Sequence, residues 1–600
     1  MTLARELWSI LTPGQRYQVL VAQAISLAMA ASAIVGIAAI APFFAALADP
    51  QATVHESALR WLYVRGGFTS PHTFATTLAI MFVLLVIASN LVSALGAQAM
   101  NRIARRIGNE LQATLFAEYL RRPYAFHSGV NSTTLLNKVV NEAGRLNEGM
   151  LQNLFTLVTN ATTGSLIVTS VIAVSPAIAL TLLAGLVGGY FLIYASIRAR
   201  LVRLGHAHSR AWSEQARIAA ETFAGIKEIL LLADRRRFQE GFERASAQLG
   251  SATARIRAVE KVPRHVMECV AVCALVSVAL ILNARTAGVG SWLAKLSFLG
   301  FATYRLLPVL QQLFVAIVRI RAERDGFTAL AQDLRRARTA SLPAEVSAGN
   351  AWLGAPRETI RLVDASVRYS ADGAPALLNA NLRIPARAMV AIVGPNGSGK
   401  TTLMDVIAGL LAPTAGEMRI DGIAVTAASR PAWLSRVAYV CQHVFLLDAT
   451  LAENIAFGVR PEAIDRARLA RAAQLAQLDE FVSDLPRGYE HVVGERGVRL
   501  SGGQRQKIGI ARALYRGTSV LLFDEATSAL DSHAETEILA TLRALRGSCT
   551  ILLISHRAST IRACDMSVRL EAGRIVAVEL APDAAADRVP PGVAWPRTQS

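Results

Sequence analysis

A glycine-rich loop at residues 394–402 has the residue types of a phosphate-binding site. It follows a strand-like run at 390–393 and precedes a helix-like run at 403–411. The glycines let backbone amides surround phosphate oxygens, and the start of the next helix favours negative charge. In this pattern Lys400 reaches the β- and γ-phosphates, and Thr401 can ligate Mg²⁺. The predicted phosphate site consists of Gly394, Pro395, Asn396, Gly397, Ser398, Gly399, Lys400, Thr401 and Thr402.

Two adjacent carboxylates end the strand-like run at 520–524. Asp524 closes that run, which makes it the expected metal-side partner of the phosphate loop. Glu525 follows directly, where it can polarise an attacking water. A lone Asp-Glu pair is more often a solvated strand end, but its combination with the phosphate loop favours hydrolysis of a bound nucleotide.

The pentapeptide at 500–504, Leu-Ser-Gly-Gly-Gln, precedes a helix-like run at 505–516. It resembles the signature of ATP-binding-cassette proteins, and the resemblance covers essentially the whole chain. In that family the pentapeptide caps the γ-phosphate of an ATP held by the other subunit's phosphate loop, with a hydroxyl, amides and a helix N-terminus. The residues to which the resemblance gives this role are Ser501, Gly502, Gly503 and Gln504.

Further positions match the family in order and spacing. The resemblance implies that Tyr369 stacks on adenine, and that His556 is the switch that contacts the γ-phosphate. Gln442 is implied in the loop that links the site to the membrane domain and as a ligand of Mg²⁺. The run 494–497 precedes the signature, and the run 528–531, which ends in Asp531, is implied as an inter-subunit loop. Taken singly, a tyrosine or histidine of this kind is more often structural.

The implied site is therefore that of an ATP hydrolase with ATP and Mg²⁺ as cofactors. The catalytic residues are expected to be Glu525, His556 and Lys400, and the metal ligands Thr401, Gln442 and Asp524.

The elements that position this chemistry follow a strongly apolar first half. The chain of 600 residues is 53% hydrophobic and only 18% charged, with a mean hydropathy of +0.37. Runs long enough to cross a hydrocarbon core of about 30 Å predict membrane helices. These six runs lie at about 17–47, 74–100, 151–174, 177–197, 266–284 and 292–318. A cleaved signal peptide would have a shorter apolar region, so we reject that interpretation for the first run.

The predicted fold is thus a multidomain membrane protein. A six-helix, all-α transmembrane domain at 1–322 precedes an α/β P-loop ATP-binding cassette at 358–580. A polar linker at 323–357 joins them, and a Pro- and Ala-rich tail at 581–600 is expected to be disordered.

Charge placement indicates the topology. Arginines are concentrated in the segments after the second and fourth spans, so the positive-inside rule puts those segments, both termini and the cassette in the cytoplasm. We therefore expect a multi-pass protein of the inner (cytoplasmic) membrane of the cell. The formal charge of +18 is then largely topological, and we expect no nucleic-acid partner. Five cysteines outside any C-x-x-C pair favour reduced thiols over a disulfide or zinc site.

Several helices are expected to continue beyond the membrane. Ile103, Ile107, Leu111 and Leu115 recur every four residues until Pro123, which predicts an amphipathic extension into the cytoplasm. A return helix is predicted from near Thr133. A second hairpin is predicted around 198–262, so that two blunt tips lie at about 124–128 and 220–228. Residues 53–64 predict a small amphipathic helix on the outer surface.

Six spans before one cassette resemble a half-transporter of the exporter type. The phosphate loop of one cassette needs the signature pentapeptide of another cassette, so the working unit is expected to be a dimer. Because every motif is intact on this chain, a homodimer is favoured, and membrane lipid is expected to surround it. The runs 8–13, 41–44, 225–229 and 304–308, together with Phe238, resemble the bacterial lipid-linked oligosaccharide flippases of protein glycosylation. The resemblance implies a polyprenyl-pyrophosphate-linked oligosaccharide as the substrate, moved from the cytoplasmic to the outer side.

Arg305 is the candidate substrate residue because it lies within the sixth span, where a charge is costly unless it faces water or a partner. It could attract the pyrophosphate, or it could be a structural arginine paired between helices. Exporters of another lipid, a peptide or a drug share every ATP-site motif. An ATP-gated channel or a regulator also remains open, whereas a soluble cassette acting on DNA would lack the spans, and an importer would carry its cassette on a separate chain.

Overall fold

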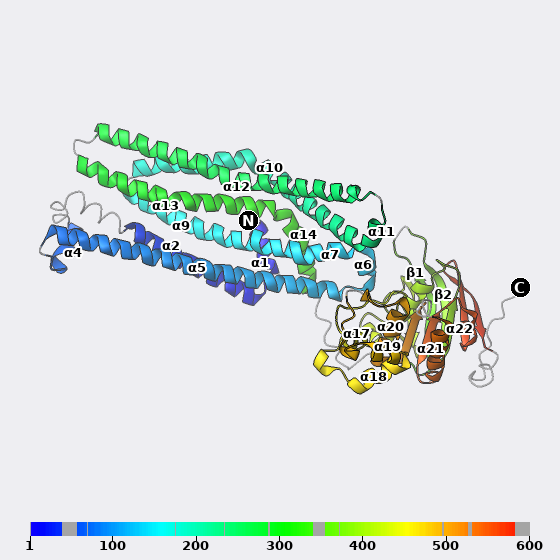
Figure 1. Ribbon diagram of the computed structural model, residues 1–600. Helices are drawn as coiled ribbons and strands as arrows, with labels where there is room; N and C mark the ends of the chain where they lie inside the picture. The colour runs from blue at the N-terminus through cyan, green and yellow to red at the C-terminus, as the bar shows by residue number, and fades with distance from the viewer. Residues whose placement is uncertain are drawn as a thin grey trace. The chain divides into compact units, whose positions relative to one another are not determined.

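The computed structural model describes residues 2–38, 57–68, 70–174, 176–232, 234–285, 289–339, 354–370, 373–494, 497–525 and 531–581. The chain divides into two compact units. The helical unit comprises 1–122 and 130–340, and the cassette unit comprises 341–600 together with 123–129 (Figure 1). The predicted class, a helical membrane domain followed by an α/β cassette, is confirmed.

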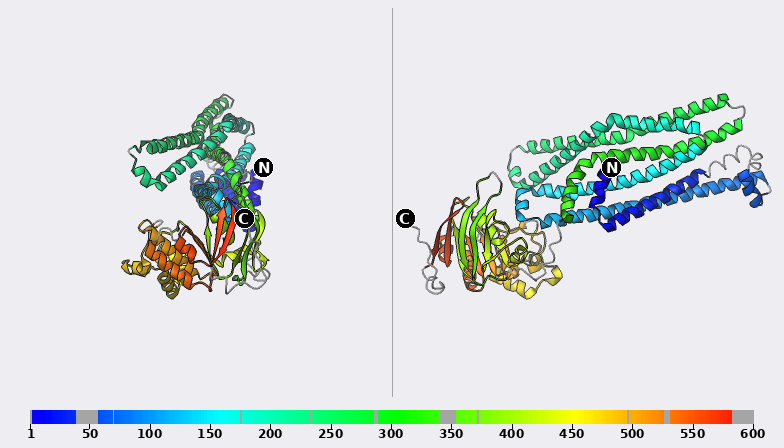
Figure 2. Two further views of the ribbon diagram at one scale, coloured as in Figure 1. Left: turned by 90° about the vertical axis from the view of Figure 1, so that its right-hand side faces the viewer. Right: turned by 180° about the vertical axis from the view of Figure 1, so that it is seen from behind.

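Long helices build the helical unit. The pairs α10 and α12, α9 and α13, and α2 and α5 lie side by side (Figures 1 and 2). Their bounds, with those of the shorter helices, are α1 Thr2–Ile10, α2 Pro13–Ala38, α4 Ser57–Arg65, α5 Pro71–Arg121, α7 Ser132–Leu136, α8 Ala143–Arg145, α9 Gln152–Val174, α10 Pro176–Ala224, α11 Ile226–Leu230, α12 Arg236–Arg285, α13 Val289–Ala322 and α14 Arg324–Thr339. Two π-helical segments, η2 Asn137–Glu142 and η3 Leu146–Leu151, lie between α7 and α9.

Four helices among the described residues are long and apolar enough to cross a membrane: Pro13–Val35, His72–Arg121, Gly149–Ile172 and Gly300–Ala322. They coincide with the predicted first, second, third and sixth spans. The predicted fourth span lies on α10, where Gly185–Ile197 is a shorter apolar helix. The predicted fifth span lies on α12, and the end of the first, at 39–47, falls outside the described residues.

The predicted extensions are present as continuous helices. α5 has 51 residues, α10 has 49 and α12 has 50. At 1.5 Å per residue a helix of this length reaches about 75 Å, well beyond a hydrocarbon core of about 30 Å. α5 ends at Arg121, two residues before Pro123, and the return helix α7 begins at Ser132, where the Asn131 side chain accepts from the Thr133 amide over 2.8 Å.

The small amphipathic helix predicted at 53–64 is present over its described residues. α4 covers Ser57–Arg65, and residues 53–56 lie outside the described part of the chain. Its Trp61 is exposed, and the Arg65 guanidinium lies 5.1 Å from the centre of the indole ring.

The cassette unit holds two sheets. A four-stranded antiparallel sheet has the order β2-β1-β4-β5, and a six-stranded sheet has the order β10-β9-β3-β8-β7-β6. In the second sheet β9, β3, β8, β7 and β6 run parallel, so their carboxyl ends meet at one edge. The strands are β1 Thr359–Val367, β2 Leu377–Pro385, β3 Met389–Val393, β4 Ala415–Ile420, β5 Ile423–Ala424, β6 Val437–Val440, β7 Val520–Asp524, β8 Thr550–Ile554, β9 Met566–Glu571 and β10 Arg574–Leu580.

Helices cover the parallel sheet, whose strands β3, β7 and β8 are buried on both faces, as their continuous apolar runs predict. The helices of this unit are α6 Tyr124–Gly129, α15 Lys400–Ala408, α16 Arg430–Leu434, α17 Leu451–Ile455, α18 Arg466–Leu475, α19 Asp479–Asp484, α20 Gly502–Arg516, α21 Ser532–Ala544 and α22 Ala558–Arg562, with 3₁₀ turns η4 Pro461–Ala463 and η5 Gly488–Glu490.

Candidate functional site

The glycine-rich loop connects β3 to α15 in a backbone shape that excludes side chains. Gly394 has φ 151°, and a Cβ there would lie 2.2 Å from the carbonyl oxygen of Leu570. Gly399, the residue before α15, has φ 98°, and a Cβ there would lie 2.5 Å from the carbonyl oxygen of Ala376. These contacts are with backbone, which cannot move aside cheaply, so the loop needs glycine at both ends of its turn.

Lys400 is folded against the loop that precedes it. Its side chain is almost fully buried, and Nζ donates to the carbonyl oxygens of Gly394, over 2.9 Å, and Pro395, over 3.0 Å. The ammonium group is therefore held above the loop, where its third proton can be donated to an anion.

Ser398 supplies a test of whether a nucleotide fits. Its hydroxyl oxygen is buried and has no hydrogen-bond partner in the structure. A buried hydroxyl without a partner is costly, and a phosphate oxygen placed in the loop would supply the missing acceptor. Together with the two strictly required glycines and the Lys400 ammonium, this makes the loop fit the phosphates of ATP.

The predicted metal ligands Thr401 and Asp524 are brought together. The Thr401 hydroxyl hydrogen-bonds to the Asp524 carboxylate, and the Tyr439 hydroxyl donates to its Oδ2 over 3.2 Å. Burial raises the pKa of Asp524 above its ordinary value, while these two hydrogen bonds act in the opposite direction. A hydroxyl and a carboxylate beside a phosphate loop are the oxygen ligands that Mg²⁺ prefers, with water and phosphate completing its shell.

A second buried carboxylate, Asp405, lies behind this pair and was not singled out from the sequence. It lies on α15, five residues after Lys400, and its side chain is almost fully buried. Burial and the neighbouring Asp524 raise the pKa of Asp405 to about 6. The only sequence signal was an acidic residue on the buried face of a helix.

Glu525 is held between two of the predicted residues. Gln442 Nε2 donates to Glu525 Oε2 over 2.7 Å, and His556 Nε2 lies 3.5 Å from Oε1. The three residues come from loops that follow β6, β7 and β8, whose carboxyl ends meet at one edge of the sheet. Glu525 has φ 49°, a strained conformation for a residue with a side chain, and such strain is concentrated at functional sites. The arrangement can orient a water with the carboxylate.

Tyr369 lies beside α15. The residue is 58% exposed, which leaves a face of the ring for stacking, and its hydroxyl lies 3.1 Å from the Thr402 hydroxyl.

The signature residues cap a helix. Ser501 Oγ accepts from the Gln504 amide over 3.1 Å, and Gln504 Oε1 accepts from the Ser501 amide over 2.8 Å. This reciprocal capping box begins α20 and leaves the amides of Gly502 and Gly503 at its positive end. Among the described residues, no hydrogen bond joins this helix start to the phosphate loop of the same chain.

Asp531 caps α21 in a similar way, since its side chain accepts from the Ala534 amide over 2.8 Å, and this hydrogen bond lowers the pKa of Asp531. Glu495, Arg496 and residues 528–530, which complete the two predicted loops, lie outside the described residues.

Arg305 lies on α13 and lines a cavity of about 490 Å³ in the helical unit. Its Nε is buried without a hydrogen-bond partner, and its guanidinium lies 5.5 Å from the centre of the Phe301 ring. Among the described residues it forms no ion pair, so no partner supports the structural alternative. Arg264 lines the same cavity and pairs with Glu268 over 2.7 Å.

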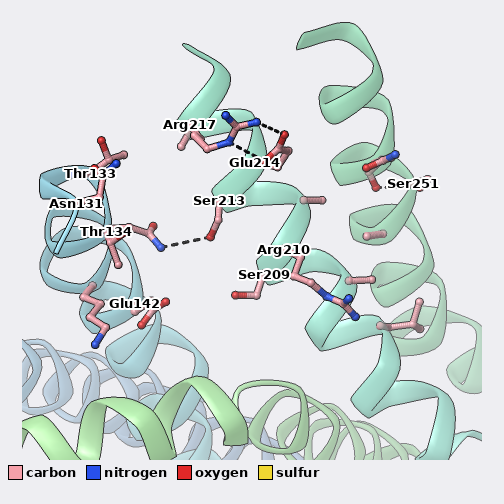
Figure 3. A pocket seen from close by; sticks show the side chains of 18 of the residues that line it. Asn131, Thr133, Thr134, Glu142, Ser209, Arg210, Ser213, Glu214, Arg217 and Ser251 are labelled. Carbon is pink, nitrogen blue, oxygen red and sulfur yellow. Dashed lines mark hydrogen bonds and ion pairs between the residues drawn. The ribbon is translucent and has the colours of Figure 1, made fainter. Parts of the chain in front are cut away.

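A larger cavity, of about 910 Å³, lies between α7, η2, α10 and α12 (Figure 3). Polar side chains line it: Asn137 Nδ2 donates to Ser213 Oγ over 3.4 Å, and Arg217 binds Glu214 over 2.6 Å (Figure 3). The sequence predicted the helices but not the space between them, because its lining is spread over three distant segments.

Comparisons with known proteins cover both units. A family model described as "ABC transporter transmembrane region" matches residues 19–305, and one described as "ABC transporter" matches residues 377–528. An "ATP-dependent lipid A-core flippase" of Ralstonia nicotianae is 30% identical over 489 residues, 79% of each chain. A protein of the same description from Alkalilimnicola ehrlichii is 32% identical over 480 residues, again 79% of each chain.

A solved structure, that of a bacterial Atm1-family ABC exporter with ATP bound, matches 95% of this chain and 96% of its own with a TM-score of 0.75. At 23% sequence identity this likeness shows a shared fold.

Proposed function

Because this chain belongs to the ABC transporter family, in which a cassette couples ATP hydrolysis to transport, we propose that it flips a polyprenyl-pyrophosphate-linked oligosaccharide across a bacterial inner membrane. ATP hydrolysis coupled to transmembrane transport follows from the family. The cargo, the direction from the cytoplasmic to the outer leaflet and the homodimeric state are the proposal.

The observation that carries the cargo is the chemistry of the cavity at Arg305. A charged residue within a membrane span is costly unless it faces a cavity or a partner, and Arg305 faces a cavity with its Nε unpartnered. A planar guanidinium binds phosphate oxygens through two parallel hydrogen bonds, which suits a pyrophosphate.

Many of the other side chains in the cavity wall can hydrogen-bond a sugar. Side-chain amides and hydroxyls, which can both donate to and accept from sugar hydroxyls, share the wall with Arg305. They are Asn90, Ser93, Asn101, Gln152, Thr156, Thr159, Asn160, Thr163 and Gln312. Contacts between helices hold this wall together, since Ser26 Oγ donates to Thr159 Oγ1 over 2.8 Å and Asn160 Nδ2 donates to Gln312 Oε1 over 3.1 Å. Apolar side chains such as Phe155, Ile167 and Val309 share the wall, so the cavity offers contacts for both the glycan and the lipid part of an anionic glycolipid.

A second candidate cargo has its own support. The relatives from Ralstonia nicotianae and Alkalilimnicola ehrlichii are described as lipid A-core flippases, so a lipid A-core glycolipid is the alternative within the same class. Both candidates imply lipid flipping, and they differ in the lipid and the glycan.

In the ATP site, Lys400 and the loop amides hold the β- and γ-phosphates, and the Ser398 hydroxyl donates to a phosphate oxygen. Thr401, Asp524 and Gln442 would hold Mg²⁺, which would neutralise charge that develops on the transferred phosphoryl group. Glu525 orients the water and accepts its proton, while Gln442 and His556 fix the carboxylate. The start of α20 would contact the γ-phosphate of an ATP held in the phosphate loop of a second copy of the chain.

Reconstitution tests the cargo. The protein in liposomes would receive a fluorescent polyprenyl-pyrophosphate oligosaccharide in one preparation and a fluorescent lipid A-core in another. ATP-dependent loss of the first lipid from the cassette-side leaflet supports the proposal, and flipping of the second alone supports the alternative. Ion conductance without lipid movement would instead indicate a channel. Liposomes with Glu525→Gln protein give the background.

A further inference from the structure

A half-buried tyrosine lies beside two carboxylates in the cassette unit. The Tyr439 hydroxyl donates to Asp524 Oδ2 over 3.2 Å, and the buried Asp405 carboxylate is a second acidic neighbour of Tyr439. Tyr439 comes from β6, Asp524 from the end of β7 and Asp405 from α15, so the cluster joins three elements.

The strand register explains why the hydroxyl reaches Asp524. β6 and β7 run parallel, and Tyr439 pairs with Leu522. Asp524 lies two residues further along β7, on the same face, because side chains alternate along a strand. Two residues of strand span about 6.6 Å, which is the reach of a tyrosine side chain laid along the sheet. A shorter residue at 439 could not make this contact.

The position of the hydroxyl leaves the rest of the carboxylate free. Tyr439 binds Oδ2, and the Thr401 hydroxyl approaches the same carboxylate from the start of α15. Side chains that hydrogen-bond a metal ligand fix its orientation, and they affect metal affinity although they do not touch the metal. The structure contains such an arrangement for Asp524.

We propose that Tyr439 is a positioning residue that orients the Asp524 carboxylate for Mg²⁺. The inference rests on the proposed ATP site, in which Asp524 is a metal ligand. It adds one residue that does not touch the nucleotide.

A purely structural role predicts something different. The Tyr439 ring packs against the core formed by strands β3, β7 and β8 with α15, and a phenylalanine would fill the same space. If only the ring matters, Tyr439→Phe leaves metal binding unchanged. If the hydroxyl positions Asp524, the same substitution weakens metal binding while the fold persists.

The test measures Mn²⁺, a spectroscopic substitute for Mg²⁺, bound to the full-length protein with ATP, by electron paramagnetic resonance. Tyr439→Phe should weaken Mn²⁺ binding about tenfold, the lower end of what loss of such a partner costs. ATP binding measured in EDTA should stay within about twofold of wild type. Tyr489→Phe, which removes the hydroxyl of a half-buried tyrosine elsewhere in the cassette unit, should change neither quantity.

Wild-type Mn²⁺ affinity in Tyr439→Phe, or an equal loss of ATP binding in EDTA, would overturn the role of Tyr439. Failure of the wild-type protein to bind Mn²⁺ with ATP would instead overturn the ATP site itself.

Discussion

The side-chain amide of Gln442 donates a hydrogen bond to Oε2 of Glu525 over 2.7 Å. Gln442 follows β6 and Glu525 follows β7, so the contact ties two neighbouring loops at the carboxyl edge of the parallel sheet. It leaves Oε1 of Glu525 facing His556. The carboxylate thus has one oxygen held by an amide and the other directed toward the predicted γ-phosphate switch.

This contact predicts the behaviour of Glu525→Gln. The substituted amide can turn its oxygen toward Gln442, so the loop geometry persists, but the group can no longer accept a proton from water. We expect ATP hydrolysis to fall about 10²- to 10⁴-fold, the usual contribution of a general base. ATP binding, measured with a fluorescent analogue, should persist and should trap a closed dimer that is detectable by crosslinking. Hydrolysis at the wild-type rate would show that another residue is the base.

Lys400→Ala should act on binding instead. Two carbonyl oxygens of the loop hold the ammonium group, which leaves a proton to donate to a phosphate of ATP. Because a hydrogen bond to a charged group contributes about 1.5–3 kcal/mol, we expect its loss to lower ATP affinity roughly 10- to 150-fold. Equilibrium titration with labelled ATP measures it. Lys261→Ala, on α12 of the helical unit, is the control and should bind ATP as wild type does.

The sequence revealed the parts of the site that are local in the chain. The phosphate loop needs glycines at fixed spacing and a following helix, so 394–402 could be recognised without the fold. Asp524 and Glu525 were recognisable because a buried apolar strand ends just before the second of them. Asp405 and Tyr439 were not recognisable, because their placement near Asp524 depends on strand register and on how α15 lies on the sheet.

The same distinction holds in the helical unit. Pro123 predicted the end of α5 within two residues, since proline lacks the amide that the helix needs. The π-helical segments η2 and η3 were not predicted, because no residue type encodes their wider hydrogen-bond spacing. Here Gln112 Nε2 donates to the carbonyl oxygen of Val139 over 2.9 Å, a contact between residues 27 positions apart.

Mixed dimers test whether each ATP site is shared between two chains. A chain with both Lys400→Ala and Gly502→Asp, paired with a wild-type chain, spoils both shared sites and should abolish cooperative hydrolysis. Lys400→Ala on one chain and Gly502→Asp on the other leaves one shared site intact, so about half the activity should remain. Sites contained within single chains predict the reverse order. Differently tagged chains, purified over two affinity columns, allow the comparison.

The two hairpin tips are predicted to dock on the cassette near Gln442. The second tip exposes apolar side chains that are costly in water, with Phe223 72% and Ile226 40% exposed, which motivates a docking role. The native Cys441 is exposed and adjacent to Gln442. In a protein whose other four cysteines are replaced by serine, Ala125→Cys or Ile226→Cys should form a disulfide with Cys441. Asn109→Cys, on the shaft of α5, should not. Absence of crosslinking from every position in both tips, with and without ATP, would remove the proposal.

Substitution of Arg305 tests the proposed cargo. If its guanidinium, whose Nε has no hydrogen-bond partner, binds a pyrophosphate, Arg305→Ala should reduce flipping of the lipid-linked oligosaccharide about tenfold or more and should lower the sensitivity of flipping to salt. Arg305→Lys should retain part of the flipping activity and part of its sensitivity to salt, because lysine keeps the charge but loses the planar pair of donors. Basal ATP hydrolysis should change little. Arg321→Ala is the matched control, since Arg321 lies on the same helix, stacks on Tyr194 at 5.3 Å and is absent from the cavity wall.

The structural alternative predicts that both Arg305 substitutions lower thermal stability and folded yield together, through loss of a buried partner. Transport per folded dimer and melting temperature, measured on the same preparations, separate the two. Wild-type flipping by a well-folded Arg305→Ala protein would exclude a headgroup role for the arginine. The amides and hydroxyls of the wall, together with Arg264, would then remain as the groups that could select a glycosylated lipid, and Gln312→Leu would be the next substitution to test, because Gln312 both lines the cavity and accepts from Asn160.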